Sequence, residues 1–547
     1  MPGFVNFLMT SNFAGLKLGF AWIPGSSLRP TWLRRTGKPG MTCCKSSFQL
    51  IIMRCRNIMD IQILLAFIVY FACVFCIGLF ALKKSAKSSD FSLGNRSTNY
   101  WVTGISAHAS EMSGWLFMGY PAMVMATGLM GAWTAIGLVV FMFLNWHFIA
   151  KKLRVETART NSLTLSTFFE KRFGDRSGLI RLISAFFCLL FFTFYISASL
   201  VELGRLFQSV LGINYHIGIT VGIIVVFYTL LGGYLSMVWI DFFQGLFLLV
   251  MILLIPLIGL IKIGGLAPIQ AISTAQNIPF TLFPDFSYKT ISSIIFAAAG
   301  WGLGYFGQPH ILTKFMGIQD ADEIKKAKYL GISWQILVLF GATLVALVGI
   351  AYFTYFNINL PSKELVYVMM VKDIFPPFIA GFILCAIIAA AINVISAQIL
   401  VLSSTLTEDL FKKMFVAKTA NMSSMQSANM IKKFSQVSVL VVCVIAYCSA
   451  FSTDKPIFDL VYYAWTGLGA SFGPLIIMSL YSKMRSRYAA IAGLLIGGLT
   501  AAFWPATSTG IPAMIVAYIL SFFVMIIGEK LDRTKITQDF DSYPPMA

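Results

Sequence analysis

Charged residues are scarce in this chain of 547 residues, where they make up 12% of the sequence, against roughly 25% in soluble domains. The chain therefore lacks the polar sequence that several soluble domains would need, although its length alone would suggest such domains. Hydrophobic residues supply 58% of the chain, and the mean hydropathy is +0.80. They lie in long blocks, and about 20 apolar residues suffice for a helix to cross a bilayer. The composition predicts an all-α integral membrane protein embedded in a lipid bilayer.

Metal-ligand clusters are also lacking. The nine cysteines and four histidines form no metal-binding pattern. Cys73 and Cys76 have CxxC spacing but lie in an apolar block, where packing explains them. No nucleophile–base or metal constellation indicates an enzyme, so we expect neither catalysis nor a cofactor. The net charge of +19 comes from Lys and Arg in short loops, which membrane topology explains better than a nucleic-acid partner. Nothing indicates an obligate protein partner.

Residues 1–58 lack Asp and Glu and contain eight Lys or Arg. They hold no long apolar run and do not follow the order of a signal peptide. We expect a basic extension that is disordered or absent from the mature chain, with translation starting at Met59; an organelle transit peptide is the alternative. The membrane domain is expected at 59–530, followed by a cytoplasmic tail at 531–547.

Apolar blocks predict about thirteen membrane-spanning helices. Their expected bounds are Ile61–Leu82, Trp101–Met125, Met130–Ala150, Leu182–Gly204, Ile217–Leu231, Leu235–Lys262, Ile291–Gln308, Tyr329–Phe356, Phe378–Leu406, Phe434–Ser449, Ile457–Tyr481, Ala489–Trp504 and Ile511–Ile527.

Basic residues alternate from loop to loop. The loops after spans one, three, seven, nine and eleven are rich in Lys and Arg, whereas 126–129, 452–455 and 505–510 hold one basic residue among them. Short cytoplasmic loops carry the excess of positive charge. The pattern predicts an N-terminus outside and a C-terminus in the cytoplasm. The eight charges before Met59 would then have to cross outward, which also argues for their absence.

Two spans contain turn-forming residues. Span two reads AHASEMSGW at 107–115, and span seven reads GWGLGYFGQPH at 300–310. Backbone that leaves the helix inside a membrane is tolerated only in protein or beside a watery cavity. Unwound carbonyls suit a cation, and half-helix N-termini suit a carboxylate. Close packing through glycine is the alternative explanation for either segment alone.

The two breaks lie five spans apart. Two five-helix units, at about 100–262 and 290–481, then enter the membrane from opposite sides because five is odd. Inverted repeats of this kind, with interrupted segments at the binding site, are typical of secondary transporters.

At these breaks the sequence resembles a known family. ASEMSGWL at 109–116, GWGLGYFGQPHIL at 300–312 and TEDL at 407–410 resemble the sodium:solute symporter family, and within it the bacterial sodium/proline symporters. The resemblance begins at Met59 and covers essentially the whole chain after it. It implies a leucine-transporter-type 5+5 inverted repeat, alternating access, sodium-driven uptake and a place in the bacterial inner membrane.

The resemblance places a sodium site between span two and span nine. Its carbonyl donors correspond to Ala109, Met112 and Ala390, and oxygen ligands suit a hard cation. Two adjacent hydroxyls of the family correspond to Asn393 and Val394. Asn393 offers an amide oxygen and Val394 offers no ligand, so the site loses at least one side-chain ligand.

Carboxylates in the spans are the second departure. Glu111 stands where the relatives carry Asp, and Glu202 stands where they look apolar. Acids inside a membrane are functional candidates, although Glu202 has an alternative partner in Arg205, at i, i+3. The resemblance also assigns coupling or gating roles to Asp241 and Arg96. A helix-end charge and an ordinary topology charge are their respective alternatives.

The resemblance assigns the solute to both breaks. Flat aromatic faces suit a small apolar ring such as pyrrolidine, while packing alone is the alternative for the aromatic residues. The expected solute-binding residues are Ser113, Gly114, Trp115, Tyr195, Trp301, Tyr305 and Pro309.

We therefore expect cation-coupled symport of proline or a similar small amino acid, with Na⁺ as coupling ion. Proton-coupled symport of another small organic solute is the alternative, because a sodium ligand is lost while buried carboxylates remain. A channel would need a continuous polar stripe, and a sensor would need a large signalling domain; neither is evident.

Overall fold

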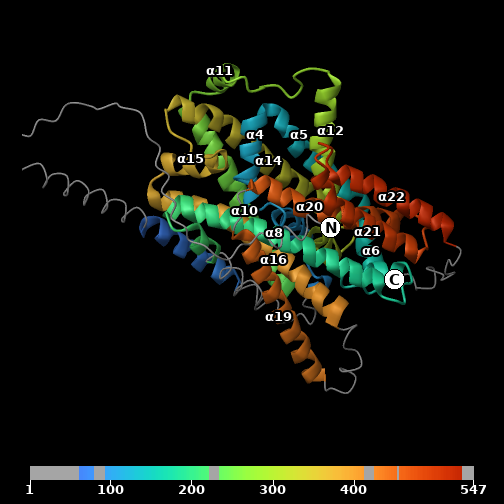
Figure 1. Cartoon of the computed structure of the whole chain (residues 1–547). Coiled ribbons are helices and arrows are strands. Elements are labelled where there is room, and N and C mark those ends of the chain that lie inside the picture. Colours follow the sequence, from blue (N-terminus) through green and yellow to red (C-terminus); the bar gives the residue numbers. More distant parts are fainter. Residues whose placement is uncertain (1–60, 79–92, 221–232, 412–423, 452–454, 533–547) are drawn as a thin grey trace, which may run out of the picture. The chain divides into compact units, whose positions relative to one another are not determined.

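The computed structural model describes residues 61–78, 93–220, 233–411, 424–451 and 455–532. Within these ranges the chain is helical (Figure 1), and its one isolated β-bridge joins Thr98 to Ile318. Ten of the described helices are long and apolar enough to cross a membrane. This agrees with the all-α membrane protein expected from composition.

The described helices follow one another in a fixed order. They are η1 (Gly94–Arg96), α3 (Tyr100–Ala109), η2 (Gly114–Leu116), α4 (Gly119–Thr127), η3 (Gly128–Gly131), α5 (Ala132–Leu144), η4 (Asn145–Ala150), α6 (Lys151–Arg159), α7 (Leu165–Arg172), α8 (Leu179–Leu211), α10 (Gly233–Lys262), α11 (Ala267–Ala275), α12 (Tyr288–Gly302), η5 (Leu303–Gly307), α13 (Pro309–Gly317), α14 (Ile324–Tyr355), η6 (Lys363–Leu365), α15 (Val366–Ile374), α16 (Pro377–Ser404), η7 (Thr405–Phe411), α19 (Ser424–Ala450), α20 (Ile457–Tyr481), α21 (Arg487–Phe503), η8 (Trp504–Thr507) and α22 (Ala513–Leu531). A first span, Ile61–Gly78, precedes them.

The ten long apolar helices account for most of the thirteen expected spans. The second half of span two and the whole of span three fall together in the run Gly114–Arg159, and span ten appears as the shorter apolar stretch Val437–Ala450 within α19. Most of span five, residues 221–231, lies outside the described residues, as do the end of span one and residues 1–58.

Both expected breaks are present. Span two consists of α3 and α4, with non-helical backbone and the short η2 between them. Span seven consists of α12 and α13, joined by η5 and an extended Gln308 (φ −82°, ψ 106°). The expected end of span seven at Gln308 agrees with the end of the apolar run Tyr288–Gly307, and Pro309 starts a further helix, α13. Proline fits the first position of a helix, where its missing N–H has no partner to lose.

The most buried spans lie nearest the breaks. In the most apolar stretch of each span, the buried share is 78% in α14, 83% in α16 and 78% in α20. It is 28% in the first span and in α22. Helix α14 packs on α3 and α4, α16 packs on α3 and η2, and α20 packs on η5. In Figure 1, α8 crosses α16, which it contacts, and α20 lies beside α21 and α22. The broken helices are therefore enclosed by α14, α16 and α20.

Candidate solute and cation site

The break in span two begins where the hydrogen-bond ladder of α3 ends. In a continuous helix the Ser113 N–H would donate to the Ala109 carbonyl, four residues earlier. It donates instead to the Glu111 carbonyl at 3.2 Å, so the regular hydrogen bonding of α3 ends at Ala109. The Ser113 hydroxyl accepts from the Trp115 N–H at 3.4 Å and begins η2. The Trp115 indole N–H returns to the Glu111 carbonyl at 3.1 Å. The loop is therefore held by its own residues, with Ala109 and Met112 in its buried backbone.

Glu111 lies inside this loop, 1% exposed, with the Tyr305 hydroxyl as a side-chain neighbour of its carboxylate. His108 is a second neighbour, with its Nδ1 3.4 Å from Glu111 Oε1. The other ring nitrogen of His108 accepts the Trp146 indole N–H at 3.0 Å. Because Nε2 accepts, a neutral His108 carries its proton on Nδ1, toward Glu111. Sequence reasoning missed His108, whose signal was its i, i+3 spacing from the carboxylate.

Glu202 reaches the same loop from α8. Its carboxylate is fully buried, accepting from the Ser113 hydroxyl at 3.0 Å and from the Gly114 N–H at 2.9 Å. The alternative pairing with Arg205 is wrong, because Arg205 instead forms an ion pair with Glu364 at 2.5 Å. Glu202 therefore contacts the broken segment of span two.

Aromatic rings join the two breaks. Trp115 of η2 stacks on Trp301 of α12, with ring centroids 5.8 Å apart. The Trp301 ring also contacts Phe458 at 4.5 Å and Tyr462 at 4.9 Å, both from α20. The Trp301 carbonyl accepts the Trp465 indole N–H at 2.8 Å, which supplies a donor where α12 stops. The expected solute residues Trp115 and Trp301 are therefore in direct contact.

Tyr305 and Tyr195 complete the group of polar side chains. The Tyr305 hydroxyl accepts from Gln335 at 2.7 Å, which leaves its own proton free to donate, and it interacts electrostatically with Glu111. The Tyr195 hydroxyl is fully buried without a partner in the described protein. Its ring meets His310 of α13 edge to face at 6.2 Å. Both nitrogens of His310 also lack a partner there, and sequence reasoning did not select this residue.

Helix α16 brings the expected cation residues of span nine toward the loop. Ala390, Asn393 and Val394 are all fully buried on α16, which packs against α3 and η2. Neither the oxygen nor the nitrogen of the Asn393 amide has a partner in the described protein. A buried amide normally forms hydrogen bonds, so its oxygen is available as a ligand.

The remaining expected residues contact α13. Arg96 donates to the carbonyls of Met316 at 2.7 Å, Thr157 at 3.0 Å and Ser162 at 2.9 Å. It is therefore a tether between three segments and not a free loop charge.

Asp241 of α10 also contacts α13, through an ion pair with Lys314 at 2.5 Å. Both side chains are 1% exposed, so Asp241 is not an exposed helix-end charge. Lys314 was overlooked because it comes after the expected end of span seven and was counted among loop charges.

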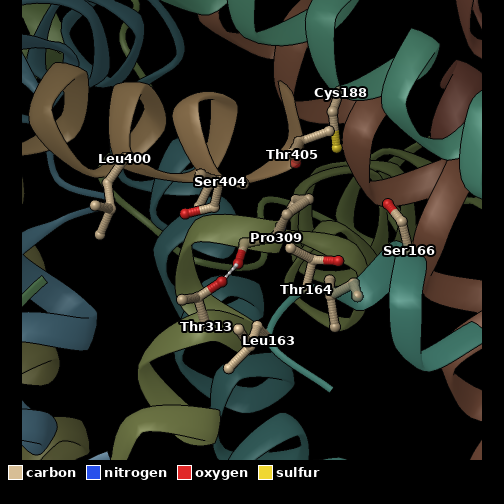
Figure 2. Close-up of a pocket in the computed structure, with 11 residues that line it drawn as sticks. Leu163, Thr164, Ser166, Cys188, Pro309, Thr313, Leu400, Ser404 and Thr405 are labelled. Atoms are coloured by element: carbon tan, nitrogen blue, oxygen red, sulfur yellow. Dashed lines mark hydrogen bonds between the residues drawn. The ribbon is translucent and has the colours of Figure 1, made fainter. Parts of the chain in front are cut away.

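A pocket lies beside Pro309, as Figure 2 shows. The Thr313 hydroxyl donates to the Pro309 carbonyl at 2.7 Å within it. Its walls come from the loop and start of α7, from α8, from α13 and from the end of α16: Leu163, Thr164, Leu165, Ser166, Cys188, Pro309, Thr313, Leu400, Val401, Ser404 and Thr405. Pro309 thus lies in the wall of a pocket edged with hydroxyls.

Comparison with known proteins gives a family and a fold. A model of the Sodium:solute symporter family matches residues 91–497. The High-affinity proline transporter PutP of Bacillus subtilis is 38% identical over 476 residues, covering 85% of this chain and 98% of that protein. Sodium/proline symporter 2 of Staphylococcus saprophyticus is 38% identical over 499 residues, covering 88% and 95%.

Solved structures agree on the architecture. A Na⁺-coupled sialic acid symporter, solved in a substrate-bound outward-open state, aligns with a TM-score of 0.71 at 17% identity, covering 87% of this chain and 99% of that one. Mhp1, a nucleobase-cation-symport-1 family transporter, aligns with a TM-score of 0.51 at 13% identity, covering 80% and 93%. The fold is the leucine-transporter-type inverted repeat with two broken helices. With a family model over residues 91–497 and relatives 38% identical over most of their length, this chain belongs to the sodium:solute symporter family.

Proposed function

We propose that this protein imports proline, or a similar small amino acid, together with Na⁺ by alternating access. The observation that carries the proposal is the joining of the two broken helices by the Trp115–Trp301 stack, with buried carboxylates at the same loop. Relatives 38% identical are named as proline transporters or sodium/proline symporters, which supports the same solute and ion.

The cation site of the proposal lies between the span-two loop and α16. Carbonyls of Ala109, Met112 and Ala390 and the amide oxygen of Asn393 are its ligands, a set of oxygens that suits a hard cation. Entry of one positive charge gains about 2.3 kcal/mol per 100 mV of inside-negative potential. Binding from outside, closure over the solute and opening toward the inside then convert the ion gradient into uptake.

The solute site of the proposal is the aromatic group around Trp301, together with Ser113, Gly114 and Tyr195. Flat aromatic faces suit a small apolar ring such as pyrrolidine. Release proceeds past Pro309 through the hydroxyl-edged pocket beside α13. The Arg96 tether and the Asp241–Lys314 pair hold α13 and act as gating and coupling groups.

The direct test is uptake of radiolabelled proline into proteoliposomes, with sodium and proton gradients imposed separately. An inward sodium gradient is expected to drive accumulation, and a pH gradient alone is expected to have no effect. Absence of proline uptake under either gradient would remove the proposed solute. Accumulation that tracks only the pH gradient would instead establish the second candidate, proton coupling, which the loss of a ligand at Val394 and the buried Glu111 favour.

The sodium site gives a separate prediction. Replacing Asn393 with Ser and Val394 with Thr adds a hydroxyl ligand, and a hydrogen bond or ligand to a charged group is worth about 1.5–3 kcal/mol. The sodium concentration for half-maximal proline uptake is therefore expected to fall roughly tenfold. Ile395→Thr is the matched control, because it adds a hydroxyl to the next buried position of α16. An unchanged sodium requirement in the double variant would contradict this placement of the site.

The proposed orientation has the N-terminus outside and the C-terminus in the cytoplasm of a bacterial inner membrane. The basic loop after span three, which contains α6 and α7, and the basic loop after α20 then lie on the cytoplasmic side. Labelling of single cysteines in these loops by an impermeant reagent, in intact cells and in inverted vesicles, distinguishes the two orientations.

A further inference from the structure

Glu202 occupies hydrogen-bond donors that a bound solute would otherwise use. Its two oxygens take the Ser113 hydroxyl at 3.0 Å and the Gly114 N–H at 2.9 Å. A Cβ atom on Gly114 would lie only 2.8 Å from Glu202 Oε2, so the glycine permits this close approach. A solute carboxylate cannot accept these same donors while Glu202 holds them.

No basic side chain in the described part of the chain compensates for this charge. Arg205, on the same helix, is paired with Glu364, and Lys314 is paired with Asp241. Glu111, the other acid of the loop, has only His108 within ion-pair distance. Burying a charge is costly unless it is paired. Two buried carboxylates without a Lys or Arg therefore make this site complementary to positive charge.

The coupling cation balances the negative charge of one carboxylate. The surroundings of Glu202 suit a second cation, an organic one. Glu202 contacts Ser113 and Gly114, the two residues directly before Trp115, whose ring stacks on Trp301. Aromatic faces attract cations through their ring quadrupole. Tyr195, fully buried and without a hydrogen-bond partner in the described protein, interacts electrostatically with Glu202 and Glu111. An acid, aromatic faces and an unused hydroxyl are the groups that recognise an ammonium.

We propose that Glu202 is a specificity-determining residue and that the solute is recognised through a positively charged amine nitrogen, with its carboxylate dispensable. This inference rests on the proposed function only in placing the solute at the two breaks. It narrows the solute class to primary or secondary ammonium compounds, which include proline, and it excludes carboxylates without an amine.

The test measures ligand binding to the purified full-length protein through tryptophan fluorescence and thermal shift. The probes are L-proline, L-prolinamide, which keeps the amine without the carboxylate, and tetrahydrofuran-2-carboxylate, which keeps the carboxylate without the amine. Prolinamide is expected to bind with an affinity similar to that of proline. Tetrahydrofuran-2-carboxylate is expected to bind at least about tenfold more weakly, a difference of 1.4 kcal/mol. The reverse order would overturn the proposal.

Glu202→Gln removes the charge and keeps the shape. It is expected to weaken prolinamide binding about tenfold or more and to spare tetrahydrofuran-2-carboxylate, whereas Glu202→Asp keeps the preference for the amine. Glu323→Gln, at a partly exposed acid before α14, is the matched control and should leave all three affinities unchanged. An unchanged order of affinities in Glu202→Gln would overturn the proposal.

Failure of this inference is distinguishable from failure of the proposed function. Proline uptake with a strict carboxylate requirement overturns the role of Glu202 and leaves proline symport standing. Binding of prolinamide without any proline uptake removes the proposed solute and supports the ammonium site. If Glu202→Gln does not fold, the three probes on the wild-type protein still decide the question.

Discussion

Replacing Lys314 with methionine is expected to destabilise the protein by about 3–5 kcal/mol, because it leaves the Asp241 charge buried without a partner. The two side chains lie 2.5 Å apart and are each 1% exposed. The other oxygen of Asp241 has no hydrogen-bond partner in the described protein, so no neighbour there takes over. Thermal unfolding in detergent measures the loss of stability, and proline uptake in proteoliposomes measures the loss of function.

A matched pair elsewhere in the chain separates burial from charge. Lys151 and Asp322 also lie 2.5 Å apart, but their side chains are 58% and 81% exposed. Exposed pairs contribute about 0–1 kcal/mol, so Lys151→Met is expected to leave the melting temperature nearly unchanged. Equal effects of the two methionine substitutions would contradict the structural account of Lys314.

The double variant Lys314→Met with Asp241→Leu distinguishes a structural role from a coupling role. Removing both partners eliminates the unpaired charge and is often nearly neutral for stability. Stability is therefore expected to return toward that of the wild type. Uptake is expected to remain absent, since Asp241 is the proposed coupling group. Return of uptake with stability would show that the pair only holds α13 against α10.

The two breaks could be predicted from the sequence because their signals are local. Glycine, proline and polar residues that gather within an apolar run indicate a break in a membrane helix. The segment after the second break was less predictable. The helix α13, which begins at Pro309, was not predicted, and Lys314 was therefore counted among the loop charges. A proline that ends one helix and a proline that starts another have the same local sequence signal.

Partners distant in sequence could not be predicted. The only neighbour of Glu202 visible in the sequence was Arg205, three residues on, whereas its actual donors, Ser113 and Gly114, lie 89 and 88 residues away. Arg205 is itself paired with Glu364, 159 residues later. Periodicity describes one helix at a time and gives no information on which helix faces another. The sequence assigned Ser113 and Gly114 to the solute. Only the structure shows that Glu202 accepts hydrogen bonds from both of them.

The close approach of α20 to the break in span seven gives the last prediction. A Cβ atom on Gly307 would lie 2.4 Å from the Gly473 nitrogen and 2.5 Å from the Gly469 oxygen, both backbone atoms that cannot rotate away. Gly307→Ala is therefore expected to push α20 from η5 and to cost about 1–3 kcal/mol, as overpacking does.

Uptake in Gly307→Ala is expected to fall further than this loss of stability implies. Helix α20 packs Phe458 and Tyr462 against Trp301. The Gln308 side-chain amide also donates to the Trp465 carbonyl of α20. Gly78→Ala is the control, since its new methyl group would meet only Ile240 Cδ1, at an ordinary 3.7 Å. Thermal unfolding and proline affinity, measured on both variants, give the comparison. Normal solute affinity in Gly307→Ala would show that the glycine serves only to pack helices, whereas weakened affinity with moderate loss of stability would show that the break positions the solute site through α20.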